Sequence, residues 1–398
     1  MKMDQKLRSL APPRVGPFRE GVFDSPLHEE RTAAWLGVAL GIAFSVCFLT
    51  GLISHGIQHP PGWLQWFPRP SWLYRLSQGI HVTTGIASVP LLLGKLWTVY
   101  PRLWAWPPLE SVANAVERLS LLPLVGGSLF LLFSGVASIS RWLPFSASIS
   151  FPPAHYAAAW ITIGGLVVHV GAKIGATRTA LSRGARPGDG TAPMPPIARG
   201  LSRRGFLGSI AGAAVTLAAV TVGQTLRPLA WAGALAPRDP RVGPQGVPVN
   251  KTAAAARVST LATDPAYELV VEGSVPSPLR LSLADLRAMP QREARLPIAC
   301  VDGWSAMATW RGVPVRDVIA AAGGSVDAEA SVASLQRAGA PYASSDLDAG
   351  QIADQDTLLA LELNGEPLAL DHGYPVRLIG PNRPGVQQTK WLAKVVVR

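Results

Sequence analysis

Long apolar stretches dominate the first 230 residues, whereas short alternating segments dominate the rest of the chain. A helix needs ~20 apolar residues to cross a bilayer. Five stretches approach or exceed that length: residues 33–54, 76–97, 119–140, 154–175 and 206–230. The first has a helix-start signal in "DSPLHEE", with Ser25 as N-cap and Pro26 at the first helical position. The pattern therefore predicts five membrane-crossing helices.

After about residue 265 the pattern predicts a compact mixed α and β domain. "YELVVEGSV" (267–275) and "YPVRLIG" (374–380) are typical of strands, and the β-branched "WLAKVVVR" (391–398) predicts a final strand. "SLADLRAM" (282–289) and "VRDVIAAAG" (315–323) predict short helices, the second ended by Gly323. Linkers rich in Ala, Gly, Pro and Arg are predicted at 177–201 and 233–264.

Charge is distributed unevenly, and this gives the membrane half an orientation. The chain carries a net +11, but residues 1–236 hold 20 Lys and Arg against 8 Asp and Glu, while residues 237–398 hold 16 against 17. Sixteen basic residues fall in the N-terminal tail and the loops after the second and fourth spans, against three in the other two loops. The positive-inside rule places the N-terminus in the cytoplasm and, after five crossings, the C-terminal domain outside. The neutral C-terminal domain argues against a nucleic-acid partner.

Histidines gather in the membrane half, where ionisable residues usually serve a function. Six of the seven lie there: His28, His55, His59, His81, His155 and His169. In the fourth span, His155 and His169 are fourteen residues apart, which places them ~40° from eclipsed on one helix face and ~21 Å apart along the axis. This spacing predicts one axial ligand near each membrane surface for two stacked b haems. The alternative is two helix-end histidines facing headgroups.

Each haem needs a second axial ligand from another helix. On the outer side the candidates are His55 and His81, and His81 is favoured because it lies more than a turn inside its span. On the inner side only His28 is available, and its alternative is a surface histidine beside two glutamates.

Residues 25–176 resemble the di-haem cytochrome b subunits of formate dehydrogenases and hydrogenases, on the strength of this histidine placement. The resemblance implies that His28 pairs with His169 and His81 with His155. It also implies a quinone site near one haem.

The stretch "SRRGFLG" (202–208), followed by a weakly hydrophobic segment, resembles a twin-arginine export signal. Gly208 stands where Lys is commonest, and the alternative is a positive-inside cluster ahead of a fifth span. Residues 202–232 are expected to remain as an anchor helix because the signal is internal, although "AWA" and "ALA" (230–236) offer cleavage sites. The export machinery that reads such signals carries folded proteins, so the C-terminal domain is expected to leave the cytoplasm loaded with a prosthetic group.

The chain has only two cysteines, Cys47 in the first span and Cys300 in the C-terminal domain. One cysteine and one histidine, His372, argue against an iron–sulfur cluster, a c-type haem or a closed zinc site there. A soft thiolate suits a soft or high-valent metal.

Around Cys300, "CVDGWSAMATWRGVPVRDVIAAAG" resembles the molybdenum-binding segment of the sulfite oxidase family, and especially its periplasmic methionine sulfoxide reductases. "LLALELNGEPLALDHGYPVRLIGP" (358–381) and "GVQQTKWLAKV" (385–395) fit the same family. The resemblance implies that Cys300 is the only protein ligand of a molybdenum held by a pyranopterin. It also implies that certain residues border the metal or contact the anionic pterin phosphate or substrate: Asp302, Trp304, His372, Arg377 and Lys390.

These residues also have plainer interpretations. Asp302 could gate protons or cap a loop, Arg377 and Lys390 could be solvated charges, and His372 could organise a turn. Trp304 could simply belong to the core. The family has a longer N-terminal part that wraps the pterin, and here Asn250 and Lys251 are candidates to replace some of its contacts.

Together these observations predict a multi-domain protein of the bacterial cytoplasmic membrane. The expected order is a cytoplasmic tail (1–24), a four-helix cytochrome b bundle (25–176), a linker (177–201), a twin-arginine anchor helix (202–232), an outer linker (233–264) and an α+β molybdopterin domain (265–398). Its expected partners are lipid, the quinone pool, the export machinery and a small oxo donor or acceptor. The favoured activity is reduction of an S- or N-oxide with electrons from quinol. The alternatives are a sulfite-type dehydrogenase and a haem-b electron carrier with a degenerate molybdopterin fold that acts as a binding module.

Overall fold

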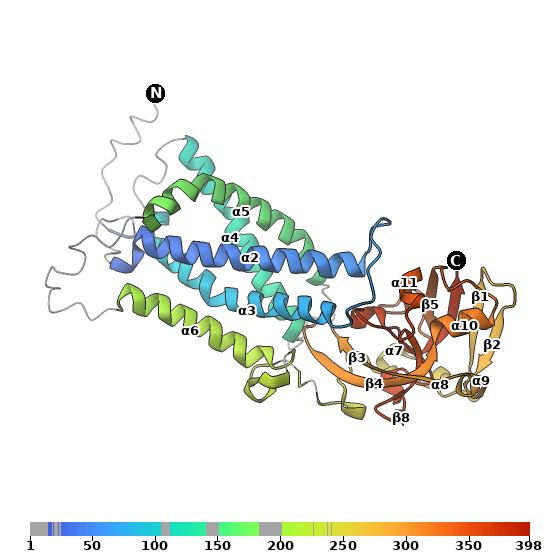
Figure 1. The fold of residues 1–398 in the computed structure, drawn as a ribbon. Helices are drawn as coiled ribbons and strands as arrows, with labels where there is room; N and C mark the ends of the chain where they lie inside the picture. Colours follow the sequence, from blue (N-terminus) through green and yellow to red (C-terminus); the bar gives the residue numbers. More distant parts are fainter. Residues whose placement is uncertain are drawn as a thin grey trace. The chain divides into compact units, whose positions relative to one another are not determined.

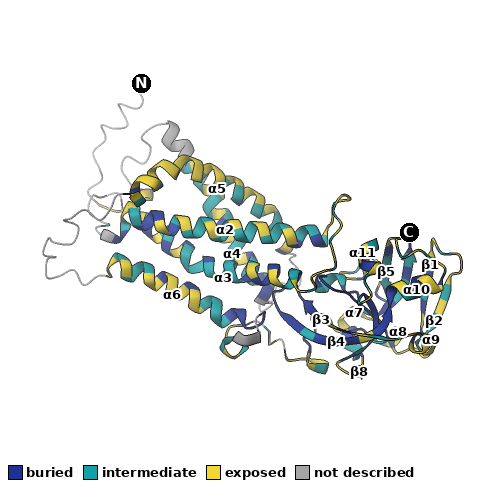
Figure 2. Ribbon diagram, in the orientation of Figure 1, coloured by how far each residue is buried: buried dark blue, intermediate teal, exposed yellow. Residues whose placement is uncertain are grey.

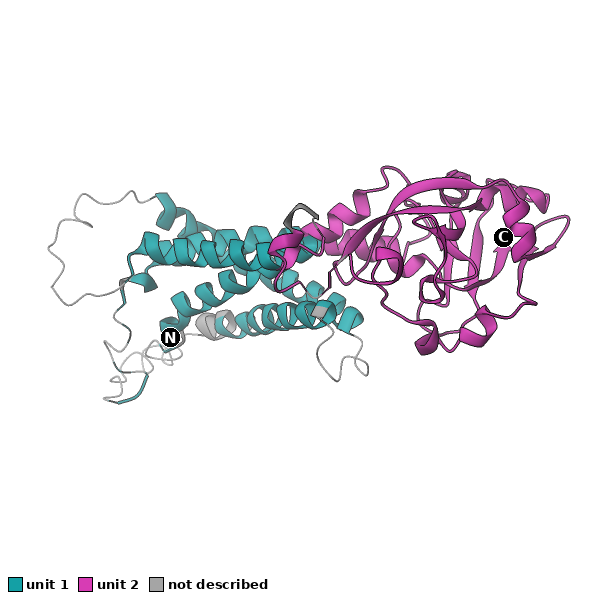
Figure 3. Cartoon of the chain, turned by 90° about the horizontal axis from the view of Figure 1, so that it is seen from below, with its two compact units in different colours: residues 1–49, 81–220 teal, residues 50–80, 221–398 magenta. Residues whose placement is uncertain are grey.

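Two compact units make up the chain (Figure 3). Unit 1 comprises Met1–Leu49 and His81–Val220, and unit 2 comprises Thr50–Ile80 and Thr221–Arg398. The computed structural model describes residues 15–17, 19, 23, 25–104, 112–140, 151–182, 201–225, 227–236, 238–239 and 241–398. Most of the predicted tail 1–24 and most of the predicted linker 177–201 lie outside the described residues.

All five predicted apolar helices are present, and each is long and apolar enough to cross a membrane. They are α2 (Glu30–Gln58), α3 (Leu73–Val99), α4 (Val112–Ser140), α5 (Phe151–Ser182) and α6 (Arg203–Val222) (Figure 1). Helix α5 continues seven residues beyond its predicted end. Helix α6 stops eight residues early, where residues 223–225 form a turn.

Small residues allow the helices of unit 1 to approach closely. A Cβ atom added at Gly127 of α4 would lie 2.2 Å from Thr162 Oγ1 of α5, and one added at Gly94 of α3 would lie 2.3 Å from Ile210 Cδ1 of α6. Helix pairs in membranes commonly pack through such small residues. Most other side chains on α2 and α5 are half-buried or exposed (Figure 2), as suits helices whose remaining neighbour is lipid.

The C-terminal part of unit 2 contains two five-stranded sheets. The first has the strand order β2-β1-β10-β5-β6. Its strands are β1 (Glu268–Gly273), β2 (Leu279–Ser282), β5 (Ala330–Ser334), β6 (Ser344–Leu347) and β10 (Leu392–Val397). The predicted final strand, β10, lies in the centre of this sheet, parallel to β1 and antiparallel to β5.

The predicted helices flank the first sheet. They are α9 (Leu283–Ala288) and α10 (Val315–Ala321), and α11 (Ala349–Ala353) is a third short helix. The Ser282 hydroxyl and the Asp285 carboxylate cap α9 reciprocally, and Gly323 follows α10 with a φ of +75°. Leu286, Val318 and Ile319 of α9 and α10 are fully buried against sheet residues, so these helices complete the core of the domain.

The second sheet contains the segment around Cys300. Its strands are β3 (Arg292–Ala299), β4 (Ser305–Pro314), β7 (Leu358–Leu363), β8 (Glu366–Pro367) and β9 (Arg377–Ile379). Strands β3 and β4 form an antiparallel hairpin with Ala299 opposite Ser305, so residues 300–304 are its turn. Strand β9 occupies only three residues of the predicted strand 374–380.

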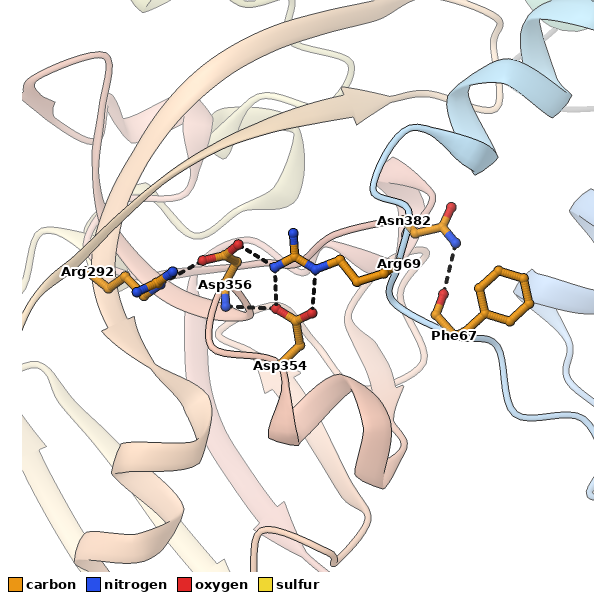
Figure 4. Close-up of polar contacts among 6 residues, drawn as sticks. All are labelled: Phe67, Arg69, Arg292, Asp354, Asp356 and Asn382. Atoms are coloured by element: carbon orange, nitrogen blue, oxygen red, sulfur yellow. Dashed lines mark hydrogen bonds and ion pairs between the residues drawn. The ribbon is translucent and has the colours of Figure 1, made fainter.

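The segment between α2 and α3 belongs to unit 2 rather than unit 1, although its sequence places it inside the predicted cytochrome b region. The Arg69 guanidinium bonds to both carboxylate oxygens of Asp354, with Nε–Oδ2 at 2.8 Å and Nη2–Oδ1 at 2.9 Å, and it also contacts Asp356. Asp356 in turn accepts a 2.6 Å bond from Arg292 Nε (Figure 4). This four-charge cluster ties the loop between α2 and α3, the predicted outer loop, to the C-terminal part of unit 2.

A second tie lies beside the cluster. The Asn382 amide donates to the Phe67 carbonyl at 2.9 Å (Figure 4) and accepts from the Tyr74 backbone N–H at 2.7 Å. Asn382 and Tyr74 are buried, so the bond between these two residues is shielded from water.

Candidate functional site

Cys300 lies in a tight turn at the end of β3, with 5% of its surface exposed. The Cys300 N–H donates to the Trp304 carbonyl at 2.9 Å, and the Gly303 N–H donates to the Cys300 carbonyl at 3.0 Å. Gly303 has a φ of +91°, a conformation that a residue without Cβ adopts without strain. Glycine at this position therefore allows the turn that carries the thiol.

The Asn250 side chain links the three predicted site residues of this turn. Its Nδ2 lies 2.7 Å from Cys300 Sγ and 3.1 Å from Asp302 Oδ2, and its Oδ1 accepts a 3.1 Å bond from Trp304 Nε1. An indole N–H can only donate, which fixes Oδ1 toward Trp304 and Nδ2 toward the sulfur. Asn250 therefore supplies a hydrogen-bond donor to the thiol from outside the Cys300 segment.

The Cys300 turn provides a single metal ligand. Among the described residues, no three His, Cys, Asp or Glu side chains gather closely enough to hold a metal ion. A metal bound at Cys300 would therefore take its other ligands from a cofactor, as a molybdenum held by a pyranopterin does.

Three basic side chains gather near this turn. Lys390 Nζ donates to the Lys251 carbonyl at 2.5 Å and to the Asp371 carbonyl at 2.8 Å. Electrostatic interactions connect Lys390 to Arg377, to Lys251 and to Cys300 itself. Because Lys251, Arg377 and Lys390 lie together, we refer to them as the cation cluster.

Arg377 is the most buried member of the cation cluster, at 2% exposure. Its guanidinium donates to the carbonyls of His372 (3.0 Å) and Gln388 (3.2 Å) and lies 5.0 Å from the ring centroid of Trp310. No carboxylate pairs with Arg377 among the described ion pairs. Burial lowers its pKa to about 9, so the guanidinium stays charged at neutral pH.

The pKa of Lys390 is lowered into the neutral range. Burial and the nearby Arg377 lower its pKa to about 7, and burial also lowers the pKa of Lys251. A bound anion would oppose both effects, because an opposite charge favours the protonated amine. The cluster therefore has the charge and the protonation behaviour of an anion site.

Glycine is needed where the chain brings the cation cluster together. A Cβ atom at Gly373, whose φ is +110°, would lie 3.0 Å from Arg377 Cβ and 3.1 Å from Lys390 Cβ. The motif "DHGYP" thus places Gly373 where β9 and the segment before β10 converge.

His372 acts as a structural tie. It is 2% exposed, and its Nε2 lies 2.8 Å from the Pro244 carbonyl. Burial and the charge of Arg377 lower its pKa to about 4, so the ring is neutral at ordinary pH and Nε2–H donates to the carbonyl. This contact joins residue 244 of the outer linker to the segment that carries Arg377.

The sequence did not single out Arg383 and Gln388. Arg383 is 3% exposed and contacts Gln351 and the carbonyls of Asp346 and Gln387, and burial lowers its pKa to about 10. The buried atoms Arg377 Nε, Arg383 Nε and Gln388 Oε1 have no hydrogen-bond partner among the described residues. Buried polar atoms normally have partners, so the two guanidinium donors suit an anionic group such as a pterin phosphate, and the Gln388 oxygen suits a hydrogen-bond donor such as a ring N–H.

The predicted outer haem ligands lie together in unit 1. The His81 and His155 ring centroids are 6.2 Å apart, with an interplanar angle of 71°. His81 Nδ1 lies 2.9 Å from the Cys47 carbonyl and His155 Nδ1 lies 2.8 Å from Ser134 Oγ. Metal-binding histidines are commonly oriented by such a bond to the other ring nitrogen, so the arrangement fits a ligand pair.

The remaining histidines are placed differently. His28 Nδ1 lies 3.2 Å from the Thr98 carbonyl, and its ring is 4.5 Å from that of Trp97. His169 lies on α5, fourteen residues after His155. His55 and His59 lie 4.8 Å apart, ring centroid to ring centroid, within unit 2.

Comparisons with known proteins identify the C-terminal part. The family model described as oxidoreductase molybdopterin binding domain matches residues 255–398. The "Uncharacterized oxidoreductase YuiH" of Bacillus subtilis is 35% identical over 127 residues, which cover 32% of this chain and 62% of that protein. Mitochondrial sulfite oxidase of Mus musculus is 34% identical over 144 residues, covering 30% and 26%.

A solved structure, the sulfane dehydrogenase SoxCD from Paracoccus pantotrophus, matches with a TM-score of 0.31 and 23% identity over 34% of this chain and 40% of that one. The chain thus spans less than two thirds of each of these proteins. The family match begins at residue 255, so the cytochrome b assignment of residues 25–176 stays a prediction. Residues 255–398 thus match the model of an oxidoreductase molybdopterin binding domain and are similar in sequence to part of the sulfite oxidases.

Proposed function

We propose that the chain is a membrane-bound molybdopterin-dependent oxidoreductase that uses electrons from quinol to reduce an S- or N-oxide at the outer face of the bacterial cytoplasmic membrane. The observation that carries this proposal is the Cys300 turn. The Cys300 sulfur accepts a hydrogen bond from the Asn250 amide and interacts electrostatically with Lys390 of the cation cluster.

The described side chains suggest how the cofactor would be held. Cys300 would ligate the molybdenum, the cation cluster would bind the anionic part of the pterin, and Arg383 and Gln388 would offer their unpartnered atoms. When bound, the cofactor supplies two-electron oxygen-atom transfer. Asn250 keeps the thiol oriented, and the buried Trp304 and Trp310 exclude water behind the turn.

Proton handling falls to groups beside the thiol. Overall, quinol and a sulfoxide give quinone, a sulfide and water, so two electrons and two protons move from donor to acceptor. Asp302 is 8% exposed, and its carboxylate lies 3.1 Å from Asn250 Nδ2. It is the candidate to carry a proton to the departing oxygen.

Histidine placement supports an electron path through two b haems in unit 1. His81 and His155 would hold the outer haem, and the bonds at their Nδ1 atoms suit this role. His28 and His169 would hold the inner haem. The haems supply one-electron steps between a two-electron quinol and the two-electron molybdenum centre.

The location and export route rest on charge and motif. The basic residues of the predicted inner loops favour a cytoplasmic N-terminus. Ser202 Oγ accepts the Gly205 N–H at 3.1 Å and so caps α6, which begins at Arg203 of the arginine pair. A twin-arginine signal read before α6 would export the C-terminal domain already folded.

A second activity, oxidation of sulfite with delivery of electrons to quinone, is favoured by the similarity to mouse sulfite oxidase. The same site would serve, with electron flow reversed. A haem-b carrier with a degenerate binding module is the alternative of another class.

Metal and haem analysis of the purified full chain tests the proposal. We expect one molybdenum and two b haems, together with turnover of a sulfoxide by quinol or of sulfite by quinone. The variant Cys300→Ser should lose turnover and leave the haem spectrum unchanged. The control is Cys47→Ser, which replaces the other cysteine of the chain. Full haem content without molybdenum would favour the degenerate binding module.

A further inference from the structure

The turn that carries Cys300 is held by two segments that lie outside the family-matched domain. Gln78 Nε2, near the start of α3, donates to the Val301 carbonyl at 2.8 Å. Thr225 Oγ1, just after α6, donates to the Gly303 carbonyl. Both segments belong to unit 2, although each continues from a membrane-crossing helix.

The two segments also contact each other. A Cβ atom at Gly79 would lie 2.8 Å from Thr225 Cγ2, and Arg75 Nη2 donates to the Thr225 carbonyl at 3.2 Å. Next to Thr225, the Gln224 carbonyl accepts the Ser305 N–H at 3.0 Å. The end of the Cys300 turn is therefore fixed to the main chain as well as to side chains.

Burial makes these contacts strong. Gln78 is 7% exposed and Thr225 is 2% exposed. In such surroundings a hydrogen bond is electrostatically stronger than in water, and leaving its acceptor without a partner is costly. The carbonyls of Val301 and Gly303 therefore have few alternatives to these two donors.

The bonded carbonyls set the shape of the turn. They belong to the Val301–Asp302 and Gly303–Trp304 peptides, and Gly303 is the residue with the greatest freedom of φ and ψ. Fixing both carbonyls fixes the backbone between Cys300 and Trp304, and so the direction in which the thiol and the Asp302 carboxylate point.

We propose that Gln78 and Thr225 are positioning residues of the molybdenum centre, through which the ends of two membrane-crossing helices set the orientation of the Cys300 ligand. This inference rests on the proposed function. In this chain the hydrogen-bond donors to the Cys300 turn come from the membrane-anchoring segments themselves. A molybdopterin domain that is merely tethered to a membrane anchor would lack these bonds.

The test compares Thr225→Val, which removes only the hydroxyl, with Thr225→Ser, which keeps it. In the full-length protein we expect Thr225→Val to bind molybdenum at the wild-type level, to show an altered Mo(V) electron paramagnetic resonance spectrum, and to reduce a sulfoxide about tenfold more slowly, as loss of an outer hydrogen-bond partner does at other metal sites. Thr225→Ser should retain the wild-type spectrum and rate. Thr263→Val is the matched control, because Thr263 directly follows helix α8 (Ser259–Ala262) and its Oγ1 bonds to the carbonyls of Ser259 and Thr260 in that helix.

A second variant tests the inference independently, in case Thr225→Val misfolds. Gln78→Glu keeps the shape but loses the N–H donor to Val301, and we expect it to change the Mo(V) spectrum in the same way. Gln58→Glu is its control, since Gln58 donates to Ser54 rather than to the Cys300 turn. Wild-type Mo(V) spectra in both Thr225→Val and Gln78→Glu would overturn the inference while leaving the proposed function intact. Absence of molybdenum from the wild-type protein would overturn both.

Discussion

The histidines of unit 1 lie on long helices, whereas the Cys300 turn of unit 2 takes its neighbours from segments as distant as residues 78, 225, 250 and 390. In unit 1, the helix period places His155 and His169 on one face of α5. In unit 2, each neighbour of the Cys300 thiol comes from a different segment of the chain. One candidate site is therefore readable from spacing within an element, while the other is assembled by the tertiary fold.

The largest expected effect is the loss of one haem from unit 1 without loss of molybdenum from unit 2. His155→Ala should remove one of two b haems and abolish quinol-linked turnover, because the ring that faces His81 is lost. Molybdenum content should stay at the wild-type level. Haem spectra and metal analysis on the same preparation check this, with His59→Ala as the control outside the predicted pair. Loss of molybdenum along with the haem would show that the two sites depend on each other.

The second-largest expected effect follows from removal of the buried Arg377 guanidinium. Arg377→Met keeps the length of the side chain but removes the most buried charge of the cation cluster, and we expect molybdenum content to fall by roughly tenfold or more. The haem spectrum should not change. Arg311→Met removes an arginine of β4 that is half exposed and paired with Glu362, and it should bind molybdenum normally. Full molybdenum content in Arg377→Met would exclude the cation cluster as the pterin site.

The lowered pKa of Lys390 predicts that the free energy of unfolding depends on pH in the cofactor-free protein only. Its pKa of about 7 lies below that of an exposed lysine, so between pH 7 and 10 the unfolded chain binds a proton that the folded chain does not. The free energy of unfolding of cofactor-free protein should therefore rise with pH in this window, by at most about 1.4 kcal/mol per pH unit.

In Lys390→Met this rise should disappear, and in the cofactor-loaded protein a bound anion should suppress it. Chemical unfolding at pH 7, 8.5 and 10 measures the slope. Equal slopes for wild type and Lys390→Met would contradict the assigned protonation of Lys390.

The smallest effect concerns the tie between the outer loop and the C-terminal domain. Arg69→Met should destabilise this attachment by about 1 kcal/mol, because Arg69 is half exposed and solvent screens its ion pairs. Protease cleavage within residues 59–72 should become faster, and more so at low salt, where the wild-type pairs are strongest. Arg280→Met, which breaks an exposed pair with Glu268, should leave that cleavage rate unchanged.

Low pH should weaken the same tie. Burial opposes ionisation of Asp356, but hydrogen bonds from Arg69 and Arg292 lower its pKa overall. The carboxylate thus contributes stability above its ordinary pKa, and this contribution is lost as the pH falls through the lowered value.

Local sequence signals predicted a large part of the fold. The five apolar helices, the short helices α9 and α10 with Gly323 at the end of α10, and the strand β1 all follow from patterns within a few residues of one another. The central position of β10 does not, because pairing partners such as Val270 and Lys394 lie more than a hundred residues apart.

The candidate site divides in the same way. Motif resemblance singled out Cys300, Asp302 and Arg377, and Asn250, which was predicted to replace a contact to the pterin, lies beside the thiol. Arg383, Gln78 and Thr225 carried no comparable signal: an arginine, a glutamine and a threonine near helix ends are common, and only the folded chain brings them to the site.

Strand β10 sets an order of events during synthesis. It follows every other strand in the chain, yet it forms the hydrogen bonds that join β1 to β5 in the middle of the first sheet. While the ribosome is still making residues 392–397, that sheet is two separate ribbons, and Lys390 has not been placed beside Arg377. If the chain binds a pterin and is exported folded, as proposed above, both events must therefore wait until β10 has been translated, long after α2–α5 have been made.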